Sequence, residues 1–308
     1  MTERSCGFEP HSRHKKIMDF PYGEMVEPPE DFVPPEMWPE FGAIANPLNG
    51  WSREWVGENP RGFRWSVWPF CFEQYIGDVE PDLKKSNEGD LARNRLIGWK
   101  RISRKETPQG WHALYSKDPW RIDGFHLLEN DYDRKWSHGV RDDLRVWTKF
   151  SQKEKYKIEN IPIESFISGY MNSTVVKKAG VIALKQVMRK YSMRDAGVKP
   201  QLLGVRNRKS GEIIAGMATY YSDKYKHSAY DCPFITPEGR STRAMIGLMA
   251  HWFSDSLMRG SKMQIFTTFW HPGRPESWKG FSQFKSYFNL KYVAYPPEIL
   301  TFARGKFF

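Results

Sequence analysis

The sequence predicts a mixed α+β domain in its second half, preceded by an acidic, Pro-rich arm and a Trp-rich region. From residue 163 onward, helical spacings of apolar residues alternate with β-rich runs, in the order helix, helix, three strands, helix, strand, helix, strand. Aromatic residues make up 15% of the 308 residues, which argues against general disorder. We therefore expect three regions: an arm over 1–60, a small Trp-rich region over 61–150 and the α+β domain over 151–308.

The arm is distinguished by its prolines and its charge. Residues 1–60 hold nine of the 21 prolines, together with 5 basic and 11 acidic residues, and show no helical or strand period. Such a segment favours extended backbone that wraps over a folded body. Trp38, Trp51 and Trp55 indicate that it docks, because disordered tails are poor in large aromatic residues.

Residues 61–150 show weaker patterns. The segment 63–72 alternates enough for one strand, and 95–102 and 110–116 are predicted strands on either side of a polar turn at 103–109. Ten of the 13 Trp residues lie between Trp38 and Trp147. This density favours a tightly packed small domain, with an aromatic-lined groove as the alternative.

The α+β domain has clearer signals. Its first half is predicted to contain a helix from Ile163, with Pro162 suited to the first turn, and a helix over 174–191. A hairpin and a further strand follow, over 201–207, 212–221 and 227–235. The second half is predicted to contain a polar loop at 236–243, a helix that ends at Gly260, a strand over 262–270, a helix over 276–288 and a strand over 291–296.

Charge and local motifs limit the function classes. Residues 151–308 hold 25 basic and 11 acidic residues, which favours contact with a polyanion such as nucleic acid or a phosphorylated ligand, although a solubility charge without a partner gives the same count.

The chain has no apolar run long enough for a transmembrane helix, no secretion-signal core and only three isolated Cys, so we expect a cytoplasmic protein. It also lacks HxxxH, Walker and GxGxxG motifs, so neither a metal site nor a dinucleotide site is expected. His227 and Cys232 form a weakly supported thiol–imidazole alternative.

The order of elements resembles the fold of the GCN5-related N-acetyltransferases (GNATs), in which a mostly antiparallel sheet splays open around an acyl donor. The segment 269–288 is similar to the C-terminal signature of the FemAB-like aminoacyltransferases, in the residues Gly280, Phe284, Lys285 and Phe288. The chain departs from that signature at Asn289, where the family often has Gly. The segment 141–170 resembles the family's bridge between two acyltransferase-like halves, which implies that any first half within 61–150 is truncated.

This resemblance implies an acyltransferase that uses direct aminolysis, with no cofactor beyond its donor. FemAB-like enzymes transfer an amino acid from an aminoacyl-tRNA to an amine on a peptidoglycan precursor. The resemblance assigns the catalytic role to Lys285, whose ammonium would lie beside the carbonyl oxygen or the phosphate of the terminal nucleotide. The alternative for Lys285 is a solvated helix lysine between two core Phe residues.

The expected donor is aminoacyl-tRNA or acyl-CoA. GNATs hold the CoA pyrophosphate on a loop of small residues, and here Arg243 and Met245 stand where Gly or Ala is wanted, which weakens the CoA alternative. Arg240 and Arg243 can still bind an anion through their guanidinium groups, or can simply be solvated residues at a capped helix start. A polyanion-binding module without catalysis is a further alternative.

The remaining candidates for substrate binding flank the predicted helix over 276–288 and the strand over 227–235. A loop rich in aromatic and basic residues can stack a nucleobase or hold a phosphate, whereas core packing explains its Trp residues equally well. The candidates are Trp270, Arg274, Trp278 and, on the strand, Tyr230.

Overall fold

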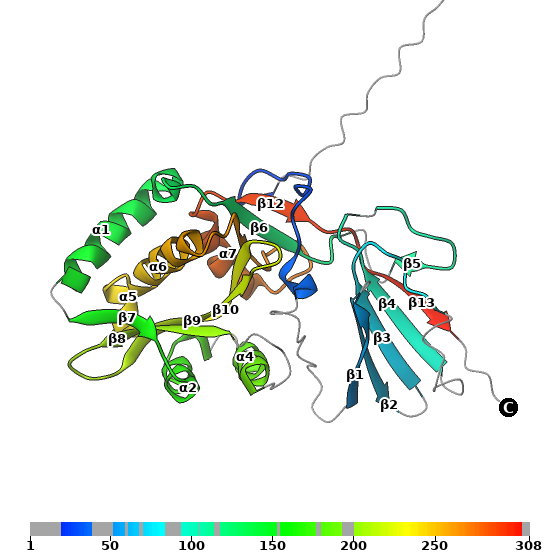
Figure 1. Cartoon of the computed structure of the whole chain (residues 1–308), viewed down its shortest axis with the longest axis horizontal. Helices are drawn as coiled ribbons and strands as arrows, with labels where there is room; N and C mark the ends of the chain where they lie inside the picture. Colours follow the sequence, from blue (N-terminus) through cyan, green and yellow to red (C-terminus); the bar gives the residue numbers. More distant parts are fainter. Residues whose placement is uncertain are drawn as a thin grey trace, which may run out of the picture.

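The computed structural model describes residues 20–38, 52–58, 61–67, 70–83, 94–103, 105–113, 118–152, 155–176, 180–192 and 200–303. These residues form two sheets that lie side by side in Figure 1. The seven-stranded sheet has the order β12-β6-β11-β10-β9-β8-β7, and the six-stranded sheet has the order β1-β2-β3-β4-β13-β5. The N-terminal arm pairs with β12 of the seven-stranded sheet, and the chain returns from β12 to the six-stranded sheet as β13.

The seven-stranded sheet consists of β6 (Ile122–Leu127), β7 (Tyr156–Asn160), β8 (Gln201–Asn207), β9 (Ile213–Ser222), β10 (His227–Ile235), β11 (Met263–Phe266) and β12 (Lys291–Ala294). All its neighbours pair antiparallel except β10 and β11, which are parallel. The parallel register ends at Ala229↔Ile265, and the pairing of β10 with β9 is irregular between Asp231 and Phe234, where Cys232 has a φ of 51°. The two strands therefore part just beyond Ala229, which confirms the predicted splayed, mostly antiparallel sheet and the adjacency of the predicted strands 227–235 and 262–270.

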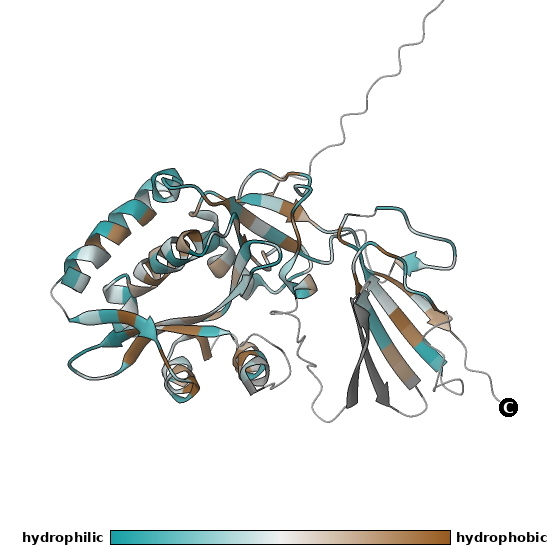
Figure 2. Cartoon of the chain, viewed as in Figure 1, coloured by the Kyte–Doolittle hydropathy of each residue, from teal (hydrophilic) through white to brown (hydrophobic). Residues whose placement is uncertain are grey.

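Helices cover both faces of this sheet. They are α1 (His138–Gln152), α2 (Ile163–Met171), α4 (Ile182–Ser192), α5 (Pro237–Ser241), α6 (Ala244–Met258) and α7 (Lys279–Ser286), with short 3-10 turns η1 (Pro35–Met37), η3 (Tyr132–Lys135) and η4 (Glu276–Trp278). One core packs α1 and α6 against the sheet, and a second core packs α2, α4 and the arm against the opposite face. Figure 2 shows the hydrophobic residues of α1 as separate bands between hydrophilic ones, as expected for a helix that buries one side.

The described part of the arm docks as predicted. Within residues 20–38, the segment around Met25 runs beside β12, where the Val26 N–H donates to Tyr292 O at 2.8 Å and the Tyr292 N–H donates to Glu24 O at 3.0 Å. Trp38 is fully buried, and its indole N–H donates to Val33 O at 2.9 Å. Trp51 lies outside the described residues.

The predicted end of the arm at residue 60 is wrong. Ser52–Glu58 is strand β1, which pairs antiparallel with β2 and so belongs to the six-stranded sheet. This strand is stabilised by hydrogen bonds to a neighbouring strand, and proline content does not report such pairing.

The six-stranded sheet differs from the prediction for 61–150 in two ways. It consists of β1 (Ser52–Glu58), β2 (Arg61–Val67), β3 (Phe70–Ile76), β4 (Asn94–Lys100), β5 (His112–Ala113) and β13 (Ile299–Ala303). The single strand predicted over 63–72 is the antiparallel pair β2 and β3, and β13 inserts between β4 and β5. A strand from the far end of the chain therefore separates the two strands that local sequence suggested as neighbours.

The predicted boundary at residue 150 does not coincide with the boundary between the sheets. β6 lies between β11 and β12 in the seven-stranded sheet, and α1 packs against α6. Both elements therefore belong with the C-terminal half. Whether β1–β5 represent a shortened acyltransferase half stays a prediction.

Within the C-terminal half the elements are confirmed and several bounds change. In the helix predicted over 174–191, α4 covers Ile182–Ser192, and Gly180 before it adopts a φ of 64°. The polar loop at 236–243 contains the short helix α5, and the strand predicted over 262–270 ends at Phe266. The strand ends early because Thr268 is in the left-handed region, with a φ of 62°. None of the described helices is long and apolar enough to cross a membrane.

Candidate active site where β10 and β11 part

Lys285 is buried on α7, at the place where β10 and β11 part. Its side chain and that of Ser282, one turn earlier, form the buried side of this short helix. The Lys285 ammonium donates to Thr267 O at 2.6 Å and to Thr268 O at 3.2 Å, immediately after the end of β11. Only 7% of the residue is exposed, so the alternative of a solvated helix lysine is wrong.

The surroundings of Lys285 are aromatic. Its Nζ lies 4.7 Å from the ring centre of Phe281, 5.2 Å from that of Phe269 and 5.9 Å from that of Tyr230. Burial lowers the pKa of Lys285 to about 8, although the negative charges of Asp123 and Asp231 oppose this shift. No carboxylate of the described residues lies within ion-pair distance, and the two carbonyls use two of the three N–H donors. One N–H of a buried cation is thus left for a further acceptor.

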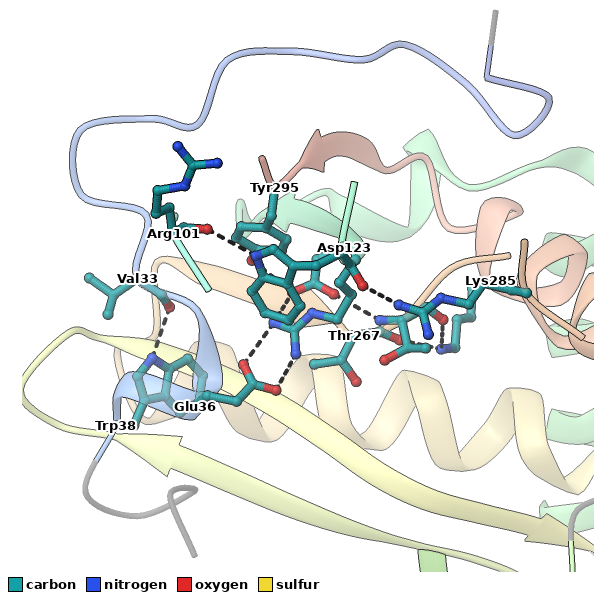
Figure 3. Close-up of polar contacts among 12 residues, drawn as sticks. Val33, Glu36, Trp38, Arg101, Asp123, Thr267, Lys285 and Tyr295 are labelled. Carbon is teal, nitrogen blue, oxygen red and sulfur yellow. Dashed lines mark hydrogen bonds and ion pairs between the residues drawn. The ribbon is translucent and has the colours of Figure 1, made fainter. Parts of the chain in front are cut away.

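Asp123 organises the backbone that holds Lys285. This fully buried side chain accepts from the Thr268 N–H at 2.8 Å, from Arg121 Nη2 at 2.6 Å and from the Tyr295 hydroxyl at 2.8 Å. Because the peptide group between Thr267 and Thr268 accepts from Lys285 through its C=O and donates to Asp123 through its N–H, it couples the two charged side chains (Figure 3). Burial raises the pKa of Asp123, and the Arg121 guanidinium opposes that rise.

The arm completes this network. Glu36, on η1, binds Arg121 through both carboxylate oxygens, with 2.7 Å between Arg121 Nη2 and Glu36 Oε2 (Figure 3). Tyr295, which donates to Asp123, also stacks on Trp120 with 4.8 Å between ring centres. The sequence analysis missed Glu36, Arg121, Asp123 and Tyr295. An acidic residue in the mainly apolar run Ile122–Leu127, which also contains His126, was the one local signal, because a buried carboxylate needs donors around it.

The structure brings Trp270, Arg274 and Trp278 together in the segment between β11 and α7. The Trp270 indole N–H donates to Arg274 O at 3.2 Å, and the Arg274 guanidinium lies 5.9 Å from the ring centre of Trp278. Trp278 in turn contacts Phe281, with 5.7 Å between ring centres, and Phe281 contacts the Lys285 ammonium. These predicted residues therefore adjoin Lys285 through one aromatic side chain.

Arg240 and Arg243 lie in a different environment. Both are exposed, and Arg243 Nε donates to Asp143 on α1 at 2.8 Å, whereas Arg240 donates to Thr174 at 3.3 Å. Arg243 precedes α6 with a φ of 62°, the backbone region that Gly adopts readily. None of the contacts described for these two side chains involves Lys285.

Tyr230 is buried beside the parting of the strands. It packs on Trp252 and Phe266, with ring centres 5.1 and 5.4 Å away, and burial raises the pKa of its hydroxyl. The His227 side chain, considered as half of a thiol–imidazole pair, lies with Nε2 at 2.9 Å from Asp31 O in the arm. Among the described residues, no three His, Cys, Asp or Glu side chains are grouped so that they could hold a metal ion.

The arrangement suits stabilisation of a developing negative charge. A buried ammonium, fixed by two carbonyls and surrounded by rings, keeps its remaining N–H in a low-dielectric environment, where a charge-assisted hydrogen bond is strong. A group with a pKa of about 8 is mainly protonated at neutral pH, so it is present as the cation.

Comparison with solved structures identifies the fold. The chain is similar to a structure described as FemX, at a TM-score of 0.59 and 10% identity over 82% of this chain and 88% of that one. It also matches the C-terminal domain of a putative lysylphosphatidylglycerol synthetase from Agrobacterium fabrum, at a TM-score of 0.48 and 10% identity, over 81% of this chain and 84% of that one. A third match is a tandem GNAT protein from the clavulanic acid biosynthesis pathway, at 0.43 and 12%, over 92% of this chain and 91% of that one.

No protein-family model and no curated protein matches the sequence. At 10% identity, the FemX likeness establishes the fold and nothing finer. Together with the parting of β10 from β11, it confirms the predicted fold: the chain has the fold of the FemX structure.

Proposed function

We propose that this protein is an acyltransferase that transfers an aminoacyl or acyl group to an amine by direct aminolysis, with Lys285 as the catalytic residue. The observation that carries the proposal is the spare N–H of a buried lysine at the parting of two strands, in a chain with the fold of FemX. A fold alone does not establish an activity, so the argument depends on the site.

The proposed reaction needs no covalent enzyme intermediate. The acceptor amine attacks the carbonyl carbon of the donor ester, and a C–N bond forms as the carbonyl oxygen gains negative charge. The Lys285 ammonium donates its free N–H to that oxyanion. When the intermediate collapses, the ester C–O bond breaks, and the leaving alkoxide takes the proton that the amine gives up.

Aminoacyl-tRNA is the proposed donor. The basic C-terminal half favours a polyanion, and Arg243 and Met245 occupy positions where a CoA cradle needs small residues. The resemblance to FemAB-like aminoacyltransferases suggests an amine of a peptidoglycan precursor as acceptor. Acyl-CoA is the competing donor, because the GNAT-type fold is also that of CoA-dependent enzymes.

The test is incubation of the purified chain with charged tRNA or acyl-CoA and an amine acceptor, followed by mass spectrometry of the products. Lys285→Met removes the charge with little change in volume, and Lys291→Met changes an exposed lysine on β12 as a matched control. We expect transfer from charged tRNA that Lys285→Met abolishes and Lys291→Met preserves. Transfer from neither donor, or full turnover in Lys285→Met, would contradict the proposal.

A further inference from the structure

Three cationic side chains meet at Trp120, where the chain passes between the two sheets. Lys100 ends β4 of the six-stranded sheet, and its ammonium lies 5.3 Å from the ring centre of Trp120. Arg121, next to Trp120, has its guanidinium carbon 4.7 Å from the same ring centre. Arg274, from the segment between β11 and α7, donates through Nη2 to Trp120 O. Elements of both sheets thus place positive charge around one aromatic residue.

Two of these cations have donors to spare. The nearest carboxylate to Lys100 is that of Glu298, at 3.9 Å, and Lys100 Nζ makes no hydrogen bond within the described part of the chain. Arg274 uses Nε on His271, at 3.1 Å, and Nη2 on Trp120, which leaves Nη1 without an acceptor among the same residues. The Lys100 side chain is 22% exposed and Arg274 is half-buried, so both are reachable from solvent.

The cations are close enough to repel one another. Burial lowers the pKa of Lys100, and the positive charges of Arg121 and Arg274 lower it further, against the opposing effect of Glu298. Arg121 is itself compensated by Glu36 and Asp123. Lys100 and Arg274 have a weaker compensation, since Glu298 is 3.9 Å from the Lys100 ammonium and makes no hydrogen bond to it, and partly buried like charges that are incompletely compensated are unfavourable.

We infer that Lys100 and Arg274 form a phosphate-binding subsite of the protein. A phosphate group bound by both side chains would accept from Lys100 Nζ and Arg274 Nη1, which are the donors left unused. Trp120 connects this subsite to the Asp123 network, because Tyr295 stacks on its ring, and Arg274 continues through Trp278 and Phe281 to Lys285. The subsite therefore adjoins the proposed reaction centre on the side of the six-stranded sheet.

The assignment of that phosphate to the acyl donor rests on the proposed function. A backbone phosphate near the 3′ end of an RNA and the pyrophosphate of a nucleotide such as CoA share the same chemistry. Phosphate binding can be measured without acyl transfer, so the subsite and the proposed activity are tested separately. Phosphate binding without acyl transfer would support the subsite and contradict the proposed activity.

The experiment measures equilibrium binding of inorganic pyrophosphate, of a short RNA ending in CCA and of CoA to the full chain. Lys100→Gln is the first variant, because Lys100 makes no hydrogen bond whose loss would disturb the fold. We expect it to raise the Kd of pyrophosphate about 10-fold, with Lys100→Gln/Arg274→Gln weaker still. Lys105→Gln, a mainly exposed lysine of the same region, is the control and should keep the wild-type Kd.

A variant that is expected to bind pyrophosphate more tightly serves as a second test, because misfolding cannot explain tighter binding. Glu298→Gln keeps the side-chain shape that accepts from Gln74 but removes the charge that competes for Lys100. It should lower the Kd of pyrophosphate several-fold. Loss of RNA binding in Lys100→Gln identifies a nucleic-acid donor, and loss of CoA binding identifies a nucleotide donor. An unchanged Kd for all three probes in Lys100→Gln overturns the inference.

Discussion

Lys285 and Lys100 are two buried or half-buried lysines whose pKa burial lowers, yet their surroundings differ. Lys285 is held by two backbone carbonyls and by rings, with no carboxylate at ion-pair distance among the described residues. The Lys100 ammonium makes no hydrogen bond among the same residues and lies near charged groups, with Glu298 as an anion and Arg121 and Arg274 as cations. Neutral carbonyl acceptors orient the Lys285 ammonium without neutralising its charge. The cations near Lys100 add positive charge, which a bound anion would compensate. The comparison separates a group suited to reaction from a group suited to binding.

The largest expected effect is on turnover. Lys285→Met should lower kcat/KM for transfer by about 100- to 1000-fold, because the oxyanion loses its charged donor. Lys100→Gln should chiefly raise KM for a phosphate-bearing donor. Steady-state kinetics on both variants, with circular dichroism as the check on folding, measures the contrast. Equal loss of kcat in the two variants would show that the two lysines do not divide reaction and binding as described.

The Asp123 network should account for a large part of local stability. Asp123→Ala leaves the buried Arg121 with Glu36 alone, so the free energy of unfolding should fall by about 3–5 kcal/mol. Asp142→Ala removes an exposed ion pair on α1 and should cost less than about 1 kcal/mol. Urea denaturation compares the two. A small effect in both would mean that the Asp123 carboxylate does not hold the Thr268 peptide in place.

The pH dependence of stability tests the burial of Lys285. Its pKa falls from 10.5 in the unfolded chain to about 8 in the folded one, so between these values the unfolded state binds more protons. Stability therefore rises with pH across that window, by about 3 kcal/mol in total from this group. Subtracting the stability profile of Lys285→Met from that of the wild type isolates the contribution. A flat difference between pH 8 and 10.5 would indicate that the ammonium is solvated.

The contact between Glu36 of the arm and Arg121 should contribute less to the free energy of unfolding than Asp123 does. Glu36→Gln keeps the side-chain shape and removes the charge that faces Arg121, so we expect a loss of about 1–3 kcal/mol in the free energy of unfolding. Glu27→Gln, which loses only the exposed pair with Lys105, is the matched control on the same arm. Limited proteolysis should report faster cleavage near residue 36 in Glu36→Gln alone.

The smallest expected effect concerns Lys100. Lys100→Met should change the free energy of unfolding by less than about 1 kcal/mol, because the side chain makes no hydrogen bond and its ion pair is long. The same substitution at Lys285 alters both activity and pH dependence. Thermal denaturation is sufficient for this comparison, and a loss of several kcal/mol in Lys100→Met would assign Lys100 a structural role.

Local sequence was sufficient for the C-terminal elements. Apolar residues at helical and strand spacing report which face is buried, and turn residues such as Gly260, with a φ of 74°, report where an element stops. The resemblance of the segment from Gly280 to Phe288 to the FemAB-like signature likewise indicated Lys285. These features were predictable because each depends on residues within one or two turns of each other.

Tertiary structure alone decided the rest. Glu36, the pair Arg121 and Asp123, and Tyr295 come from three separate parts of the chain, and β13 joins β4 across about 200 residues. Pairing between distant strands and compensation of buried charge depend on which backbone groups and which side chains meet in the fold. The sequence therefore determined the elements and the candidate lysine, and only the fold determined which charges surround it.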